Sequence, residues 1–150
     1  MKSEPHITFR RKPATLDCAA LEMFAQTLED RVAKRREFHC LVTGDAELQS
    51  LNRQFRRRDY PTDVLSFPAV SPNGAARPYL GDIAISIQRA RAQAREFGIS
   101  LEDELRILML HGVLHLTGLD HESDTGQMAR RERRWRKILG LATSLTERAS

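Results

Sequence analysis

The sequence predicts an α+β domain in which one small sheet of four strands packs with about five helices. The chain has 150 residues, 41% of them hydrophobic, which suits a single domain spanning residues 1–150 with a core that needs no disulfide. Short β-prone runs and longer segments of helical apolar spacing follow one another without an internal repeat. Their order is strand, helix, strand, helix, strand, strand, helix, helix, helix.

The first half of the chain is expected to alternate between strands and helices. Apolar residues recur at helical spacing after Leu16, and the basic segment 34–36 suits a helix C-terminus. His39 falls within a β-prone run and is interpreted as a structural residue. The predicted elements are a strand at residues 7–9, a helix at 16–36, a strand at 38–43, a helix from Asp45 to before Pro61, and a strand at 63–67.

The second half is expected to be mostly helical. Residues 69–79 are rich in Pro, Gly, Asn, Ser and Ala and are expected to form a loop long enough to cover a site. Because this loop connects the third and fourth strands directly, we expect these two strands to be neighbours. Ser86 and Ser100 are predicted N-caps, and Gly98 a C-cap. The predicted elements are a strand at 80–86, a helix at 87–97, a helix after Ser100 that is apolar on nearly every side, and a helix from Ser123 or Asp124 to about Gly140.

The charge balance suits a polyanionic partner. The formal net charge is +4, and 20 of the 24 basic residues are arginine, whose planar fork pairs well with phosphate. An arginine-rich proteome would give the same excess. The last predicted helix carries basic residues at nearly every position around Trp135, which favours a solvated face over an RNA-binding stripe. Because no signal peptide or membrane-spanning run is recognisable, we expect a cytoplasmic protein with no membrane partner and with reduced thiols.

Three histidines near the end of the fourth helix predict a metal site. His111 and His115 are four residues apart, so their rings lie on one face of a helix, one turn apart. Gly118 is expected to end this helix in the left-handed conformation and to let the chain bring in His121 as a third ligand. Three neutral ligands leave one tetrahedral position open, as in catalytic zinc sites. The alternative is a set of ordinary histidines satisfied by backbone carbonyls or caps.

One residue separates this motif from that of the zinc proteases called metzincins. They share its histidine spacing and its glycine, but carry a glutamate general base where this chain has Gly112. A glycine cannot accept a proton, so peptide hydrolysis by their route is disfavoured.

The stretch from His111 to His121 resembles the H-G-x-L-H-L-x-G-x-D-H signature of the YbeY endoribonucleases, which are bacterial ribosomal RNA maturation factors. Further matches lie at residues 51–59, 62–68 and 80–83, in the same order. The resemblance covers roughly residues 40–140, and the histidine signature is its most specific part.

This resemblance implies a metal-dependent endoribonuclease specific for single-stranded RNA, with a zincin-like fold built on a small mixed sheet. It also implies a role in maturing the 3′ end of small-subunit ribosomal RNA and in ribosome quality control. The implied partners are precursor ribosomal RNA, the small ribosomal subunit and assembly factors. The implied ligands of one zinc ion are His111, His115 and His121, although nickel, copper or cobalt also suit such a site.

The family's functionally important arginine corresponds to Arg56. An arginine near a metal would stabilise the negative charge that develops during phosphodiester cleavage, while the metal lowers the pKa of a bound water. Arg57 and Arg58 are expected to guide the RNA backbone. Asp120 either orients a ligand imidazole or caps the helix, and Asp82 is either a structural acid or a site residue.

Two other functions stay open at this point. A zinc peptidase is supported by histidine spacing alone, and Gly112 argues against it. In a non-enzymatic protein the metal would be structural, and the chain would act as a ribosome assembly factor.

Overall fold

The structure, a computed structural model, describes residues 4–56, 62–69, 79–118 and 126–141. Its elements follow the predicted order with one addition, a π-helical turn after the first helix. They are β1 (Ile7–Phe9), α1 (Cys18–Thr27), the π turn η1 (Leu28–Val32), β2 (Phe38–Thr43), α2 (Asp45–Arg56), β3 (Val64–Pro68), β4 (Gly81–Ser86), α3 (Ile87–Phe97), α4 (Leu101–Thr117) and α5 (Gln127–Leu139).

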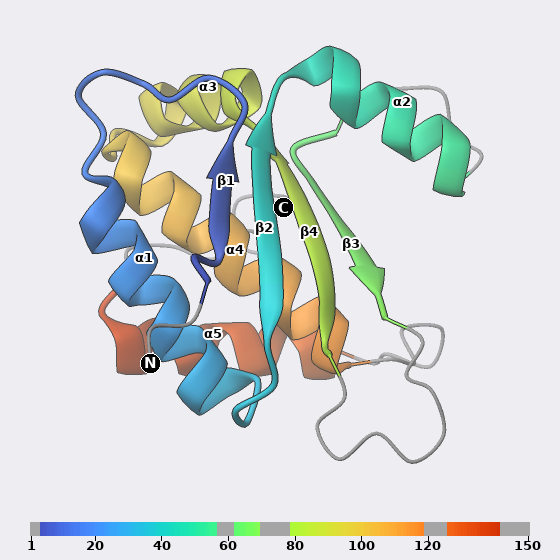
Figure 1. Ribbon diagram of the computed structural model, residues 1–150. Helices are drawn as coiled ribbons and strands as arrows, with labels where there is room; N and C mark the ends of the chain where they lie inside the picture. Colours follow the sequence, from blue (N-terminus) through green and yellow to red (C-terminus); the bar gives the residue numbers. More distant parts are fainter. Residues whose placement is uncertain (1–3, 57–61, 70–78, 119–125, 142–150) are drawn as a thin grey trace.

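The four strands form one mixed sheet in the order β1-β2-β4-β3, which confirms the α+β class (Figure 1). β1, β2 and β4 are parallel, and β3 runs antiparallel to β4 at the edge, so the third and fourth strands are neighbours as expected. In this register Asp82 lies opposite His39 on one side and opposite Phe67 on the other. Directly opposed residues point to the same face of a sheet, so these three side chains share a face.

Helices cover both faces of the sheet. On one face α4 crosses β4, where Gly112 meets the side chain of Ile83 (Figure 1). On the opposite face Leu48 of α2 is buried against Leu65 and Ala84, which alternate along their strands with residues that face α4. The larger core lies on the α4 face, between the sheet and helices α1, α4 and α5. Among the described residues, no helix has the length and apolarity needed to cross a membrane.

The first helix is shorter than the predicted span of residues 16–36. It begins at Cys18, because the Asp17 carboxylate caps it by accepting from the backbone N–H of Ala20 at 3.0 Å. It ends in the π turn η1, in which the N–H of Ala33 bonds to the carbonyl of Leu28, five residues back. The next two residues, 34 and 35, have positive φ and turn the chain towards β2.

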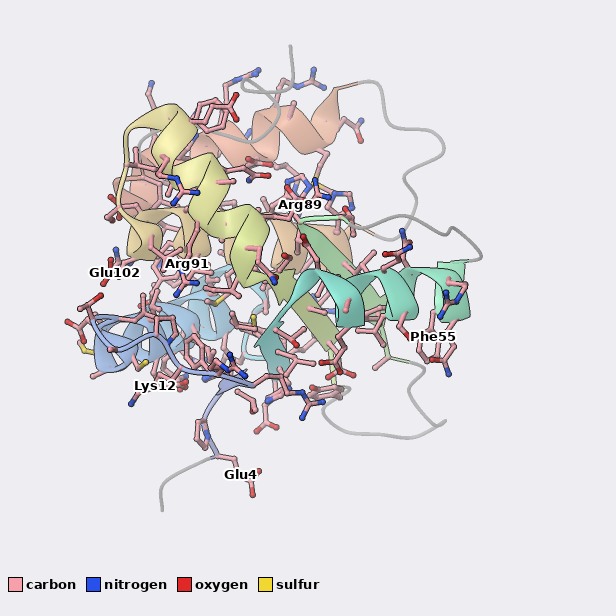
Figure 2. The ribbon with its side chains drawn as sticks, turned by 90° about the horizontal axis from the view of Figure 1, so that it is seen from above. Glu4, Lys12, Phe55, Arg89, Arg91 and Glu102 are labelled. Atoms are coloured by element: carbon pink, nitrogen blue, oxygen red, sulfur yellow. The ribbon has the colours of Figure 1, made fainter. Side chains whose placement is uncertain are left out.

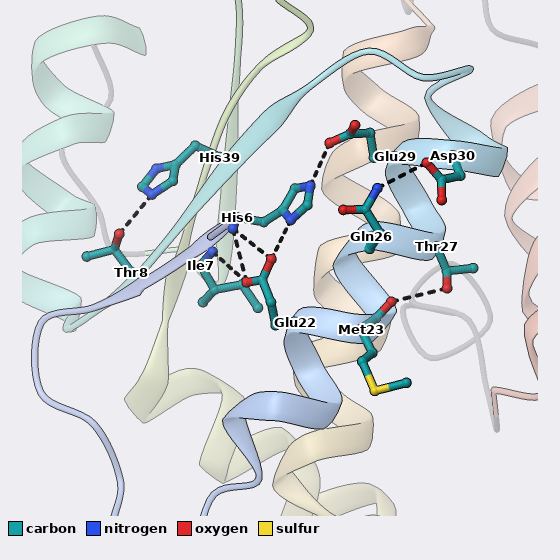
Figure 3. A network of polar contacts seen from close by, with 10 residues as sticks. All are labelled: His6, Ile7, Thr8, Glu22, Met23, Gln26, Thr27, Glu29, Asp30 and His39. Atoms are coloured by element: carbon teal, nitrogen blue, oxygen red, sulfur yellow. Dashed lines mark hydrogen bonds and ion pairs between the residues drawn. The ribbon is translucent and has the colours of Figure 1, made fainter. Parts of the chain in front are cut away.

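The π turn forms part of a polar cluster around a buried histidine, shown in Figure 3. Nδ1 of His6 lies 2.5 Å from a carboxylate oxygen of Glu22, and its Nε2 lies 2.6 Å from one of Glu29. Glu22 also accepts hydrogen bonds from the backbone N–H groups of His6 and Ile7. Both nitrogens of this ring are therefore occupied by carboxylates, and the cluster ties β1 to α1 and η1.

The remaining helix ends agree with the sequence in most places. Ser86 and Ser100 cap α3 and α4, and Gly98 ends α3 with a φ of 66°. The last helix ends at Gly140 as predicted but begins at Gln127, later than Ser123 or Asp124, because Gly126 has a non-helical φ of 95°.

Candidate metal centre and active site

Helix α4 carries the first two predicted ligands on one face. From Leu105 onwards its apolar side chains are almost completely buried, so the backbone that bears the histidines is enclosed by protein. Nε2 of His115 lies 2.9 Å from Nε2 of His111, and the ring centroids are 4.4 Å apart. Two nitrogens bound to one tetrahedral zinc lie about 3.3 Å apart, given Zn–N distances of about 2.0–2.1 Å. The two rings thus converge closely enough to share one cation.

A buried carboxylate on α5 fixes the orientation of His111. Oε1 of Glu132 lies 2.7 Å from Nδ1 of His111, and the glutamate is only 1% exposed. An ionised carboxylate can only accept, so Nδ1 carries the proton and Nε2 presents its lone pair towards His115. This carboxylate–histidine arrangement recurs around protein-bound metals, where it sets the tautomer of the ligand.

Glu132 was not among the residues proposed from the sequence. It is the one acidic residue within α5, a helix that is otherwise rich in arginine. This isolation was the signal available in the sequence. It is a weak signal, because a lone acid among cations on a solvated helix is more often exposed than buried. Its distance of 21 residues from His111 gives no indication that the two side chains meet.

Gly112 lies between the two histidines at the contact between α4 and the sheet. A Cβ at this position would lie 3.0 Å from two side-chain carbons of Ile83, and the carbonyl of Gly112 accepts a hydrogen bond from Ser66 Oγ at 3.0 Å. The helix therefore approaches β4 closely enough to disfavour a side chain at this position. A glutamate here, as in the metzincins, would have to displace Ile83.

Gly118 corrects a prediction about how α4 ends. Its φ is −104°, so the helix does not finish in the left-handed conformation. A Cβ at this position would lie 3.1 Å from the terminal methyl carbon of Met128 and 3.4 Å from Nη1 of Arg131, the ends of two flexible side chains of α5. Arg131 also donates to the Thr117 hydroxyl at 3.1 Å, so the end of α4 is packed directly against α5.

Several predicted site residues cannot be placed beside this pair. His121, Asp120, Arg57 and Arg58 lie outside the described residues. Within the described ranges, no group of three or more His, Cys, Asp or Glu side chains is arranged to hold a metal ion. The third ligand therefore stays a prediction that rests on the sequence.

Arg56 and Asp82 lie on other elements. Arg56 is the last residue of α2, and Figure 1 draws that end of α2 apart from the C-terminal half of α4. Asp82 is exposed on β4 and accepts a hydrogen bond from the hydroxyl of Tyr79 at 2.6 Å. It shares the face of the sheet that carries α2, not the face that carries the histidines.

The outer face of α5 differs from the expectation of evenly distributed charge. Its exposed basic residues recur at helical spacing and lie on one stripe, while Arg131 and Arg136 are half-buried. Trp135 packs inward, with the guanidinium of Arg31 5.7 Å from its ring. The stripe consists of Arg130, Arg133, Arg134 and Lys137.

Comparison with known proteins identifies the family. The model of the family described as "Endoribonuclease YbeY" matches residues 6–140, which include both histidines of α4 and Glu132. The chain belongs to the YbeY family. A YbeY protein of Solibacter usitatus is 60% identical over 142 residues, covering 95% of this chain and 92% of that protein. A YbeY protein of Koribacter versatilis is 46% identical, covering 96% of this chain and 91% of the relative.

A solved structure supports the fold of this YbeY family member. The solution structure of TM1509 from Thermotoga maritima is 29% identical in sequence and superimposes with a TM-score of 0.58. The match covers 89% of each chain. The mixed sheet and its helices are therefore shared over most of both proteins.

Proposed function

We propose that this chain is a metal-dependent endoribonuclease, specific for single-stranded RNA, that takes part in ribosomal RNA maturation. Membership of the YbeY family gives the reaction class. The observation that carries the proposal is the pair of imidazole nitrogens at 2.9 Å, one of them fixed by a buried carboxylate. The proposed cofactor is one zinc ion, with His121 as the third ligand.

The donor set fits a divalent ion of the first transition series. Neutral imidazole suits zinc, nickel, copper and cobalt, and the affinity alone does not favour zinc among them. When bound, such an ion supplies a positive charge that polarises a phosphoryl oxygen and acidifies water. The residues of this chain prepare the site: Glu132 holds the proton on Nδ1 of His111, and the enclosed helix α4 limits movement of both rings.

Arginine side chains would bind the RNA itself. Arg56 is the proposed catalytic residue, because a guanidinium placed beside the reacting phosphate stabilises the charge that develops on its oxygens. Arg57 and Arg58 are proposed to hold neighbouring phosphates. The basic stripe of α5 offers a further contact for the RNA backbone, on the same helix whose inner face carries Glu132.

The proposed setting is the cytoplasm, with precursor ribosomal RNA as substrate and with the small ribosomal subunit and its assembly factors as partners. We extend the proposal to the 3′ end of small-subunit RNA and to ribosome quality control. A peptidase is disfavoured, because the position of its base is a glycine packed against Ile83. A scaffold protein with a structural metal would retain binding to ribosomal particles without any cleavage of its own.

The proposal is tested by measuring metal content and RNA cleavage in the same purified preparations. His115→Ala is expected to lose both the metal and the cleavage of single-stranded RNA. Arg56→Ala is expected to keep the metal and to lose activity by a factor of about 100–1,000, the usual cost of removing one charge-stabilising donor. Arg91→Ala, an exposed arginine on α3, is the matched control and should behave like the unchanged protein. Cleavage by metal-free His115→Ala protein would refute the proposal.

A further inference from the structure

A cavity of about 760 Å³ lies on the face of the sheet opposite to the histidine pair. Its volume falls within the range of about 300–1,000 Å³ that is common for small-ligand sites. Leu41 and Ala84 form an apolar floor, and Leu51 of α2 closes one side. Ser66 of β3 also lines the cavity, while its hydroxyl donates to the carbonyl of Gly112 on the α4 face of the sheet.

The charges at the rim of this cavity do not favour a phosphate. The guanidinium of Arg10 donates hydrogen bonds of 3.2 and 3.1 Å to the carboxylate of Glu47. Asp82 adds a carboxylate, towards which the hydroxyl of Tyr79 donates. Burial and this carboxylate raise the pKa of Tyr79, so the phenol keeps its proton and its role as a donor. A ligand would bind more favourably at this rim through N–H groups than through anionic oxygens.

Other groups at the rim suit a flat, partly apolar ligand. Phe55 is 59% exposed although it is a large apolar side chain, and its ring meets that of Phe67 edge to face at 5.5 Å. Figure 2 shows Phe55 at the end of α2 that lies away from Arg89 and Arg91 of α3. His39, whose imidazole is hydrogen-bonded to the Thr8 hydroxyl at 2.8 Å, lines the cavity as well.

We propose that this cavity binds one unpaired nucleobase of the RNA, stacked on Phe55, with an N–H group of the base directed to Asp82. Unstacked bases of single strands are commonly held in this way, on an aromatic ring and by their polar edges. Phe55 immediately precedes Arg56, so the proposed base site and the proposed catalytic arginine lie in the same turn of α2. The inference rests on the proposed function, because it takes RNA as the substrate.

The test compares removal of the Phe55 ring from the protein with removal of one base from the RNA. Binding of a short fluorescein-labelled oligoadenylate is measured by anisotropy with the metal chelated, using intact RNA and versions with one abasic position each. At one position, removal of the base should weaken binding to the unchanged protein by about tenfold or more, as expected for a stacked base. Phe55→Ala should weaken binding of intact RNA to the same extent. The affinity of this variant should not fall further when the RNA lacks the base at that position.

Two variants sharpen the comparison. Asp82→Asn should also weaken binding of intact RNA, but it should not change the affinity for RNA that lacks the base at the same position. Phe55→Tyr, which keeps a ring, should bind intact RNA normally. Met23→Ala removes an apolar side chain that is 72% exposed on α1 and serves as the matched control. The inference is overturned if the losses from Phe55→Ala and from the abasic positions simply add, or if Asp82→Asn shows no coupling. Because no cleavage is measured, failure here is distinct from failure of the metal-dependent activity.

Discussion

Two histidines of this protein, His6 and His111, are bonded to carboxylates in different ways. His6 contacts Glu22 through Nδ1 and Glu29 through Nε2, so both nitrogens of its ring are occupied by acids (Figure 3). His111 contacts Glu132 through Nδ1 alone, and its Nε2 faces another imidazole. The first ring therefore lies between two carboxylates, whereas the second has one carboxylate partner and directs its other nitrogen at a neighbouring ring.

A structural histidine and a candidate metal ligand are therefore distinguished by the group that the second ring nitrogen contacts. A metal needs a neutral imidazole with one free lone pair, which the His6 cluster cannot offer without giving up a carboxylate contact. A carboxylate partner is common to both residues and therefore does not distinguish them. This comparison can be tested by changing one carboxylate in each cluster.

The largest expected effect is the loss of metal affinity in Glu132→Gln. The amide keeps the shape of the side chain but removes the charge that orients His111 and increases its basicity, so affinity should fall by roughly 10–100-fold. Zinc affinity is measured by competition with a chelating dye.

Glu22→Gln is the matched change in the other cluster. It should leave the zinc affinity unchanged and reduce the free energy of unfolding, because Glu22 joins the His6 ring and two backbone N–H groups to α1. Equal losses of zinc affinity in the two variants would contradict the distinction drawn here.

The sequence was sufficient to predict most of the fold, because its signals are local. The capping serines at residues 86 and 100 and the glycine at 98 act through neighbouring backbone groups, and all three were predicted. The π turn η1 was missed, because a shift from a four-residue to a five-residue hydrogen bond leaves no mark in the apolar spacing. The left-handed prediction for Gly118 was wrong, since its φ is −104°. The end of α4 packs against α5 through Arg131 and Thr117, and the local sequence does not reveal this tertiary contact.

The site was only partly predictable. His111 and His115 are one helical turn apart, so their convergence followed from spacing alone. Glu132, the cavity near Phe55 and the stripe on α5 depend on how separate elements pack, which spacing within one segment does not reveal. The basic residues of α5 appeared evenly spread until the structure showed which of them are buried.

An effect of intermediate size is expected at Gly112, which holds α4 against the sheet between the two ligands. In Gly112→Ala the new methyl group would lie 3.0 Å from carbons of Ile83, and such overpacking costs about 1–3 kcal/mol. The better helix propensity of alanine returns about 1 kcal/mol. A net loss of roughly 1 kcal/mol in the free energy of unfolding is therefore expected from urea denaturation.

A double-mutant cycle identifies the source of that loss. Ile83→Ala alone should cost about 2–5 kcal/mol, as for other large-to-small changes in a core. Because it also removes the carbons that the new methyl group meets, the double variant should be more stable than the sum of the two single losses predicts. Strictly additive losses would show that Gly112 is not constrained by Ile83.

The smallest effect is expected from the titration of His6. Burial lowers the pKa of its imidazole, but the hydrogen bonds and negative charges of Glu22 and Glu29 outweigh this, and the net pKa is raised above 6.5. A raised pKa in the folded state means that the cluster stabilises the protein fully below about pH 6.5 and loses this contribution as the pH rises through the folded pKa. The effect is limited, because Glu22 continues to accept from the backbone N–H groups of His6 and Ile7.

His6→Gln provides the control, since glutamine fills similar space and carries no charge at any pH. The difference in free energy of unfolding between the two proteins should be largest at mildly acidic pH and should shrink as the solution becomes alkaline. The nearby thiol of Cys40 should not disturb this comparison, because burial, with a contribution from Glu22, raises its pKa to about 12. A difference that grows with pH would mean that His6 is neutral in the folded protein. The contrast with His111 would then rest only on what the second ring nitrogen contacts.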